Sequence, residues 1–109
     1  MKMFSVSLTD DAKEDLQDLY DYIAAHDAPI KADGVLNKLE DLMQSLAKFP
    51  ERGAVTKELR DVGIKDYREV YFKPYRVIYR VLGAKVLVYL IVDGRRDMQA
   101  LLTQRLIRA

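Results

Sequence analysis

The sequence predicts an α+β fold in which an N-terminal strand and an antiparallel helical hairpin pack on a mostly antiparallel sheet of about four strands, with a short C-terminal helix. Three observations lead to this prediction. Apolar residues recur at the helical period through residues 12–49. Runs rich in tyrosine, valine and isoleucine follow after residue 66, and there the apolar residues alternate at the period of a strand. The 109 residues, 50% of them hydrophobic, suit one domain spanning 1–109.

The N-terminal half is typical of a strand followed by two helices. Apolar and polar residues alternate over residues 3–8, and Thr9 is expected to cap the helix that follows. The first apolar stripe consists of Ala12, Leu16, Leu19, Tyr20 and Ile23. Pro29 interrupts this pattern, and the second stripe consists of Val35, Leu39, Leu42, Leu46 and Phe49. Because the connection is short, we expect the two helices to pack antiparallel.

The C-terminal half predicts a linker over residues 53–66 and then strands over 67–72, 75–82 and 86–92. Pro74 separates the first two strands, and Gly83 marks a hairpin between the last two. In the middle strand, Tyr75, Val77, Tyr79 and Val81 should face the helices, whereas Arg76, Ile78, Arg80 and Leu82 should form an exposed basic face. The third strand is apolar at nearly every position, which indicates a central strand that is covered on both sides or covered partly by a partner. Asp97 is expected to cap a final short helix.

Several kinds of site are excluded by residue content. The chain has no cysteine, which rules out disulfides and thiolate metal sites. Residues 1–8 lack the apolar run of a signal peptide, and no stretch approaches the roughly 20 apolar residues of a transmembrane helix, so we expect a cytoplasmic protein without a membrane partner. His26 is expected to be solvated at the end of the first helix. The carboxylates expected on the solvent face of that helix are Asp10, Asp11, Glu14, Asp15, Asp18 and Asp21. We therefore expect no metal and no cofactor.

Charge is divided unevenly between the two halves of the chain. Residues 1–51 hold five lysines, no arginine and eleven acidic residues, a sum of −6, whereas residues 52–109 hold nine arginines, four lysines and six acidic residues, a sum of +7. Such asymmetry indicates a basic surface that binds phosphate or carboxylate, for which the arginine fork is well shaped. The alternative is a solvated face paired with the acidic half.

Arginines and tyrosines alternate along the basic half of the chain. The arginines are Arg60, Arg68, Arg76, Arg80, Arg95 and Arg96, and the tyrosines are Tyr67, Tyr71, Tyr75, Tyr79 and Tyr89. Arginine beside aromatic rings on a sheet can hold RNA through phosphate neutralisation and base stacking, and it can equally anchor an acidic peptide. Taken singly, the tyrosines are also typical of packing residues whose hydroxyls reach water.

These arginines and tyrosines lie in short motifs that resemble one known group of proteins. The motifs are Glu58-Leu59-Arg60, Tyr67-Arg68-Glu69, Tyr75-Arg76-Val77-Ile78-Tyr79-Arg80-Val81 and Asp93-Gly94-Arg95-Arg96-Asp97. They resemble the RelE/ParE superfamily of bacterial toxins, whose compact α+β fold has the same order of elements. The resemblance implies the toxin of a type II toxin–antitoxin system, associated with growth arrest and plasmid stabilization. It also implies a cognate antitoxin whose C-terminal segment wraps the toxin in a hetero-oligomer.

The resemblance leaves two mechanisms open, only one of which makes the chain an enzyme. RelE-like toxins cleave mRNA on the ribosome; in that case Arg60, Arg68 and Arg76 would hold phosphate, Arg95 or Arg96 would stabilise the transition state, and Glu69 would be the base. ParE-like toxins inhibit DNA gyrase without known need of a hydrolytic site. Several nuclease relatives carry a histidine or tyrosine near the end of the last strand or in the C-terminal tail, where this chain has Asp93 and the segment 104–109. This difference favours the ParE-like branch.

Contacts to the antitoxin or to the target are expected from the basic half. The candidates are Arg76, Tyr79, Arg80, Arg95 and Arg96. A third hypothesis is a non-toxic module whose basic sheet binds a protein or a nucleic acid.

Overall fold

The computed structural model describes residues 3–107 and confirms the predicted α+β class. The strands are β1 (Ser5–Leu8), β2 (Ala54–Val55), β3 (Tyr67–Phe72), β4 (Tyr75–Leu82) and β5 (Lys85–Asp93). The helices are α1 (Asp10–His26), α2 (Pro29–Lys48), α3 (Lys57–Arg60) and α4 (Met98–Leu102), and a π-helical turn, η1 (Thr103–Ile107), continues α4. As far as the described chain extends, no helix is long and apolar enough to cross a membrane.

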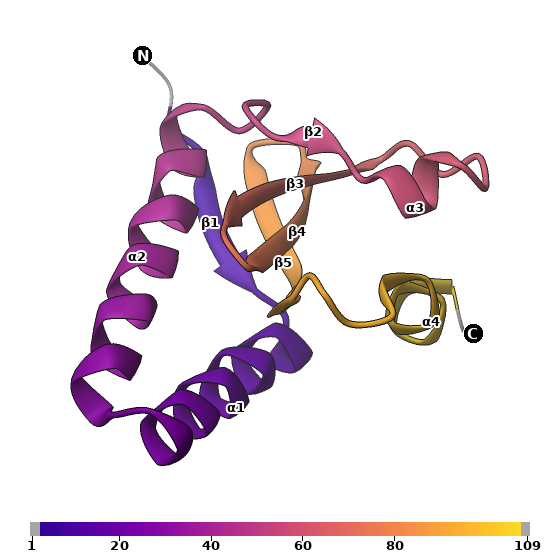
Figure 1. Ribbon diagram of the computed structural model, residues 1–109. Helices are drawn as coiled ribbons and strands as arrows, with labels where there is room; N and C mark the ends of the chain where they lie inside the picture. The colour runs from indigo at the N-terminus through magenta and orange to yellow at the C-terminus, as the bar shows by residue number, and fades with distance from the viewer. Residues whose placement is uncertain (1–2, 108–109) are drawn as a thin grey trace.

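The five strands form one sheet in the order β1-β5-β4-β3-β2 (Figure 1). β1 runs parallel to β5, and every other neighbouring pair is antiparallel. The hairpin predicted at Gly83 is present, and this glycine has a φ of 61°, in the left-handed region that glycine adopts without a steric cost. The sheet has one strand more than predicted, because two linker residues, Ala54 and Val55, pair with Glu69 and Arg68.

The helical hairpin covers one face of the sheet, as predicted. The Thr9 side chain accepts a hydrogen bond of 3.0 Å from the Ala12 amide and caps α1. The first core combines Leu39, Met43 and Leu46 of α2 with inward residues of the sheet, among them Val77 and Tyr79 of β4. The prediction for this face of β4 is therefore confirmed.

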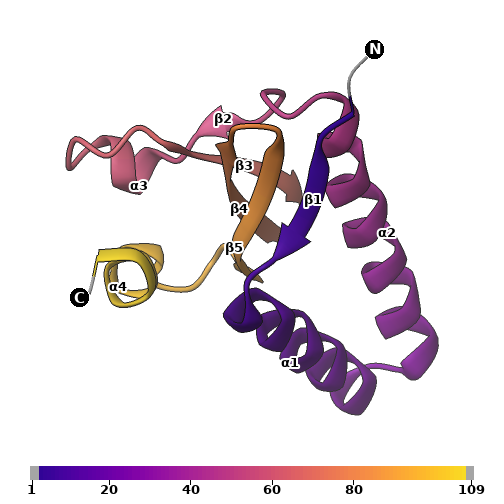
Figure 2. The ribbon, with the colours of Figure 1, turned by 180° about the vertical axis from the view of Figure 1, so that it is seen from behind.

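The second face of the sheet is also covered, which corrects the expectation of an exposed basic face. Leu59 of α3 and Met98 and Leu102 of α4 pack on Ile78, Leu90 and Val92. Figures 1 and 2 show α3 and α4 on the side of the sheet away from the hairpin. The expectation failed because α3 is a single turn, too short for a helical period to appear in the sequence. The predicted central strand, β5, is confirmed, since it contributes to both cores.

One carboxylate of α1, that of Asp15, is largely covered by other residues, whereas all were expected on the solvent face. The Asp15 side chain is 12% exposed, and Arg105 of η1 donates to it through Nη1 at 2.9 Å and Nη2 at 3.0 Å. Arg105 Nη1 also donates to the Tyr89 carbonyl at 3.0 Å, and the Ile91 amide donates to Asp15 at 3.1 Å. The hydrogen bonds to Asp15 raise the pKa of Arg105. The largely covered carboxylate of Asp15 thus joins α1, β5 and the C-terminal turn.

Candidate functional site

In the middle of the predicted basic face, Arg76 is already paired with carboxylates of the same chain. Arg76 of β4 donates to Glu58 of α3 through Nη1 at 2.9 Å and Nη2 at 2.8 Å, and to Glu69 of β3 through Nη2 at 2.5 Å. The side chains of Arg76 and Glu69 are only 11% and 3% exposed. These three residues are named the ion triad below. Arg76 was predicted to contact phosphate and Glu69 to act as the base. The fold brings the two side chains together, but each neutralises the charge of the other.

The electrostatics of the ion triad favour the charged forms of Arg76 and Glu58. Hydrogen bonding from Arg76 lowers the pKa of Glu58, and hydrogen bonding to Glu58 raises the pKa of Arg76. A carboxylate that already accepts a short hydrogen bond from a buried guanidinium is poorly suited to take a proton from an incoming hydroxyl. Glu58 belongs to the sequence motif but was not among the predicted site residues, because its pairing with Arg76 depends on the position of α3.

The ion triad also explains the glycine of the Asp93-Gly94-Arg95-Arg96-Asp97 motif. A Cβ on Gly94 would lie 2.5 Å from Cδ and 2.8 Å from Cγ of Arg76. The aliphatic stem of Arg76 therefore occupies the space that a side chain at Gly94 would need. Two motifs that are separate in the sequence fit together here through one arginine.

Two further candidates have structural partners. The Tyr79 ring is fully buried in the first core, and its hydroxyl donates to the Pro50 carbonyl at 2.7 Å and accepts from the Gly53 amide at 3.1 Å. Arg68 Nη1 donates to the Gly53 carbonyl at 2.7 Å. Tyr79 does not reach the surface, so a direct contact with a partner would require the core to open. Both residues hold the segment that leads from α2 to β2.

Arg60 and Arg80 lie near the second core and reach solvent. Arg60 is half-exposed and lies 3.8 Å from its neighbour Asp61. Arg80 Nη2 lies 3.9 Å from Asp66, and its guanidinium carbon lies 5.8 Å from the centre of the Tyr67 ring. These contacts are those of surface cations, which interact weakly with their partners. The structure does not bring Arg60 and Arg80 into one cluster with Arg95 and Arg96.

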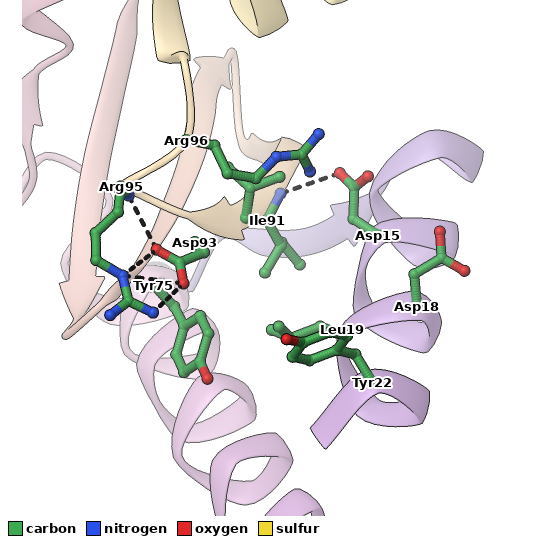
Figure 3. A pocket seen from close by; sticks show the side chains of 10 residues that line it. Asp15, Asp18, Leu19, Tyr22, Tyr75, Ile91, Asp93, Arg95 and Arg96 are labelled. Atoms are coloured by element: carbon green, nitrogen blue, oxygen red, sulfur yellow. Dashed lines mark hydrogen bonds and ion pairs between the residues drawn. The ribbon is translucent and has the colours of Figure 1, made fainter. Parts of the chain in front are cut away.

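The last two candidates, Arg95 and Arg96, line a groove between α1 and the end of β5. This hollow, named the α1–β5 groove, has a volume of about 470 Å³. Its other lining residues include Leu19, Tyr22, Tyr75 and Ile91, which point into it from both walls and the floor (Figure 3). Arg95 is 78% exposed and is held by Asp93, which accepts from its Nε at 2.9 Å and from its Nη2 at 2.5 Å. This pairing lowers the pKa of Asp93.

Tyr22 and His26 of α1 are exposed aromatic side chains, and Tyr22 lines the α1–β5 groove. Tyr22 is 63% exposed and its ring stacks on His26, with centroids 4.1 Å apart and planes 19° apart. His26 is exposed, as predicted, and its Nδ1 donates to the Tyr22 carbonyl at 2.9 Å. Tyr22 was not among the predicted binding residues, and Tyr75 was predicted only as one of the tyrosines that alternate with the arginines. Tyr22 could have been found as the aromatic residue that lies off the apolar stripe of its helix.

Nothing in the described residues resembles a metal centre. No group of three or more histidine, aspartate or glutamate side chains is placed to hold a metal ion between residues 3 and 107. The arrangement offers arginines, tyrosines and apolar side chains at its surface, which are the side chains of a binding surface.

The architecture is similar to that of chains in two solved toxin–antitoxin systems. A structure of the chromosomal ParDE toxin–antitoxin system from P. aeruginosa matches with a TM-score of 0.69 and 22% identity, over 84% of this chain and 96% of that chain. The toxin–antitoxin complex RelBE2 from Mycobacterium tuberculosis matches with a TM-score of 0.62 and 18% identity, over 85% of this chain and 93% of that chain. At these identities the likeness establishes the fold.

The family is established by the sequence. The family model for the ParE toxin of the type II toxin–antitoxin system parDE matches residues 6–98. The chain therefore belongs to the ParE toxin family, within the RelE/ParE superfamily. Among curated protein sequences, none matches the chain.

Proposed function

We propose that this chain is a toxin that inhibits DNA gyrase in the bacterial cytoplasm and that a cognate antitoxin neutralises it in a hetero-oligomer. Residues 1–109 act as one toxin domain in this proposal. The family match supports the toxin role, and the two solved relatives are toxin–antitoxin systems, which supports an antitoxin partner.

The ion triad is the observation that favours gyrase over mRNA as the target. A ribonuclease needs cations free to hold phosphate and a base free to take a proton. In this chain Arg76 forms ion pairs with Glu58 and Glu69, and Arg95 forms an ion pair with Asp93. Inhibition of a protein target requires a complementary surface but no proton transfer, and the α1–β5 groove offers such a surface.

Two reactions run with the same purified protein test this proposal. In the first, DNA gyrase, relaxed plasmid and ATP are incubated with increasing toxin, and both supercoiling and trapped DNA cleavage complexes are measured. In the second, translating ribosomes are incubated with the toxin and the mRNA is checked for cuts. The matched control in both is the toxin mixed beforehand with a candidate antitoxin, the product of a small reading frame if one adjoins the toxin gene.

The proposal predicts loss of supercoiling with intact mRNA, and recovery of supercoiling in the control. Ribosome-dependent mRNA cleavage with normal supercoiling would overturn it in favour of the RelE-like alternative. Full gyrase activity, intact mRNA and no complex with the adjacent gene product would leave the non-toxic binding module as the better description.

A further inference from the structure

The turn that leads from α2 to β2 carries an exposed aromatic ring. This turn, residues 48–53, is named the Phe49 turn below, and Figure 1 shows it at the end of the molecule opposite the connection between α1 and α2. Phe49 follows the last residue of α2 and is 57% exposed. A single exposed apolar side chain is common on protein surfaces, so the surroundings of the ring decide whether it marks a site.

The fold holds the Phe49 turn in one conformation. The Tyr79 hydroxyl donates to the Pro50 carbonyl at 2.7 Å and accepts from the Gly53 amide at 3.1 Å. Arg68 Nη1 donates to the Gly53 carbonyl at 2.7 Å. A Cβ on Gly53 would lie 2.7 Å from the Tyr79 hydroxyl, so the turn fits closely against the sheet. The phenyl ring is therefore presented from a fixed backbone, which lowers the entropy cost of binding a partner.

Three cations lie on or beside the Phe49 turn. Lys48 and Arg52 belong to it, and Arg68 of β3 donates to its carbonyls. The one acidic residue of the turn is Glu51, so these four side chains carry a net charge of +2. Arg52 Nη1 donates to the neutral Ser45 hydroxyl at 2.7 Å. Within residues 3–107, none of the three cations forms a salt bridge.

The two guanidinium groups lie close together and remain open to an anion. Arg52 is exposed and Arg68 is half-buried, and Arg68 uses only Nη1 for its bonds to the turn. Burial raises the pKa of the Tyr79 hydroxyl, whereas the positive charges of Arg68 and Arg52 oppose that rise, so both charges lie near this one hydroxyl. Two like charges held near each other are stabilised by a bound anion, and the arginine fork is well shaped for phosphate.

The negative end of the α2 dipole explains only part of this arrangement. Lys48 lies in the last turn of α2, where a cation is favourable. That effect requires neither an arginine from β3 nor an exposed aromatic ring. Arg68 also points away from the ion triad, because neighbours along a strand face opposite sides and the next residue, Glu69, belongs to the triad. The cations of the Phe49 turn are thus separate from the predicted nuclease site around Arg76.

We propose that the Phe49 turn binds DNA, with the phenyl ring stacked on an unstacked base and with Arg52 and Arg68 on the flanking phosphates. Aromatic rings beside cations are the means by which proteins hold unstacked bases and wedge base steps apart. The local charge of +2 suits a phosphate backbone. The inference rests on the proposed inhibition of gyrase, because the DNA is the segment that gyrase holds and cleaves. The contact itself can be measured without gyrase.

Fluorescence polarisation with a labelled DNA strand tests the contact. The probe is a single strand of about 15 nucleotides. Purified toxin is titrated into it at salt concentrations between about 50 and 200 mM. Phe49→Ala removes the stacking ring and should weaken binding by about tenfold. Arg52→Gln removes one phosphate contact and should make the slope of log affinity against log salt shallower by about 0.7.

Two control variants match these changes at positions away from the turn. Tyr71→Ala removes an aromatic ring that is 55% exposed on β3, and Lys38→Gln removes one positive charge from the exposed side of α2. Both controls should bind the strand as the parent does. Melting curves check that all variants fold, which is expected because Phe49 and Arg52 are exposed.

A tryptophan reporter distinguishes stacking from a structural role of the ring. The chain has no tryptophan, so Phe49→Trp places a single indole in the turn. Because indole also stacks on bases, this variant should keep the affinity of the parent, and its emission should be quenched as DNA is added. Emission from Tyr71→Trp should not change. Unquenched emission from Phe49→Trp at saturating DNA would overturn the proposal.

The gyrase reaction separates this inference from the proposed function. Phe49→Ala should trap fewer DNA cleavage complexes than the parent, with the same affinity for gyrase in the absence of DNA. If the variants instead lose affinity for gyrase without DNA, the turn contacts protein and this inference is overturned.

The remaining outcomes act on one statement or the other. If the parent binds no DNA strand, or if Phe49→Ala and Arg52→Gln both bind it within about twofold of the parent, this inference is overturned while gyrase inhibition still stands. If DNA binding is lost in the variants as expected but the parent leaves gyrase unaffected, the DNA contact is supported and the proposed target is overturned.

Discussion

Replacing Arg76 by methionine should destabilise the protein strongly, although the sequence pattern suggests a surface cation. Methionine retains part of the aliphatic stem that packs beside Gly94 and removes the guanidinium. Glu69, whose side chain is 3% exposed, is then left as a buried carboxylate without its partner. Breaking a buried ion pair by removing one member costs about 3–5 kcal/mol.

That cost translates into a large change in melting temperature. For a chain of 109 residues, the unfolding entropy makes a loss of 1 kcal/mol lower the melting temperature by about 4 °C. Arg76→Met should therefore melt about 12–20 °C below the parent. The measurement is thermal unfolding followed by circular dichroism at neutral pH. The matched control is Arg60→Met, because Arg60 is half-exposed and its ion pair is weak; its melting temperature should change by about 2 °C at most.

A double variant separates lost charge pairing from lost packing. Arg76→Met combined with Glu69→Met removes both charges and should recover most of the lost stability, since apolar replacement of a whole buried pair is often neutral. A melting temperature for Arg76→Met within about 3 °C of the parent would refute the reasoning. It would mean that the guanidinium is solvated and free to bind phosphate. If the expected drop is found, a loss of toxicity in Arg76 variants reports unfolding and is no evidence for a nuclease.

Three further predictions concern other parts of the fold. Tyr79→Phe removes a hydroxyl that bonds two backbone groups and should cost about 1–3 kcal/mol, measured by urea unfolding. Hydrogen bonding from Arg76 lowers the pKa of Glu58 below its ordinary value of 4.5. The stabilisation that Glu58 contributes is therefore complete above pH 4.5 and is lost as the pH falls through the lowered pKa. Between about pH 5 and about pH 3, the urea midpoint of Glu58→Gln should fall less than that of the parent. Asp15→Asn should speed hydrogen exchange in residues 98–107 by weakening the bond that holds the C-terminal turn, whereas Asp18→Asn, at an exposed position, should not. Equal hydrogen exchange of residues 98–107 in Asp15→Asn and Asp18→Asn would contradict the role given to Asp15.

The parts of the fold that were predictable are those encoded by local repetition. The stripes from Ala12 to Leu46 and the caps at Thr9 and Asp97 depend on residues three or four apart, and both caps are present. The predicted end of the second stripe was wrong, because Phe49 follows the end of α2 and is 57% exposed. The apolar run of β5 indicated burial on both faces, which the two cores confirm. Local signals of this kind survive in a single sequence because the interacting residues are close neighbours along the chain.

The candidate site was predictable only in composition. The sequence indicated that arginines and tyrosines in the second half carry the binding chemistry, and Arg95 and Arg96 do line the α1–β5 groove. It could not indicate that Arg76 is neutralised, because Glu58 lies 18 positions away and reaches it only through the placement of α3. It could not indicate the groove itself, whose two walls come from α1 and from the end of β5.

The amino-acid sequence was enough to predict the class of fold, the family and the kinds of side chain in the basic half. All three follow from patterns and motifs that are read along the chain. Only the folded structure shows which arginines are paired with carboxylates of the same chain and which remain available to a partner. Whether an arginine binds a partner or holds the fold together depends on which carboxylates lie within hydrogen-bond distance of it in space, and alternation along a strand carries no information about that distance.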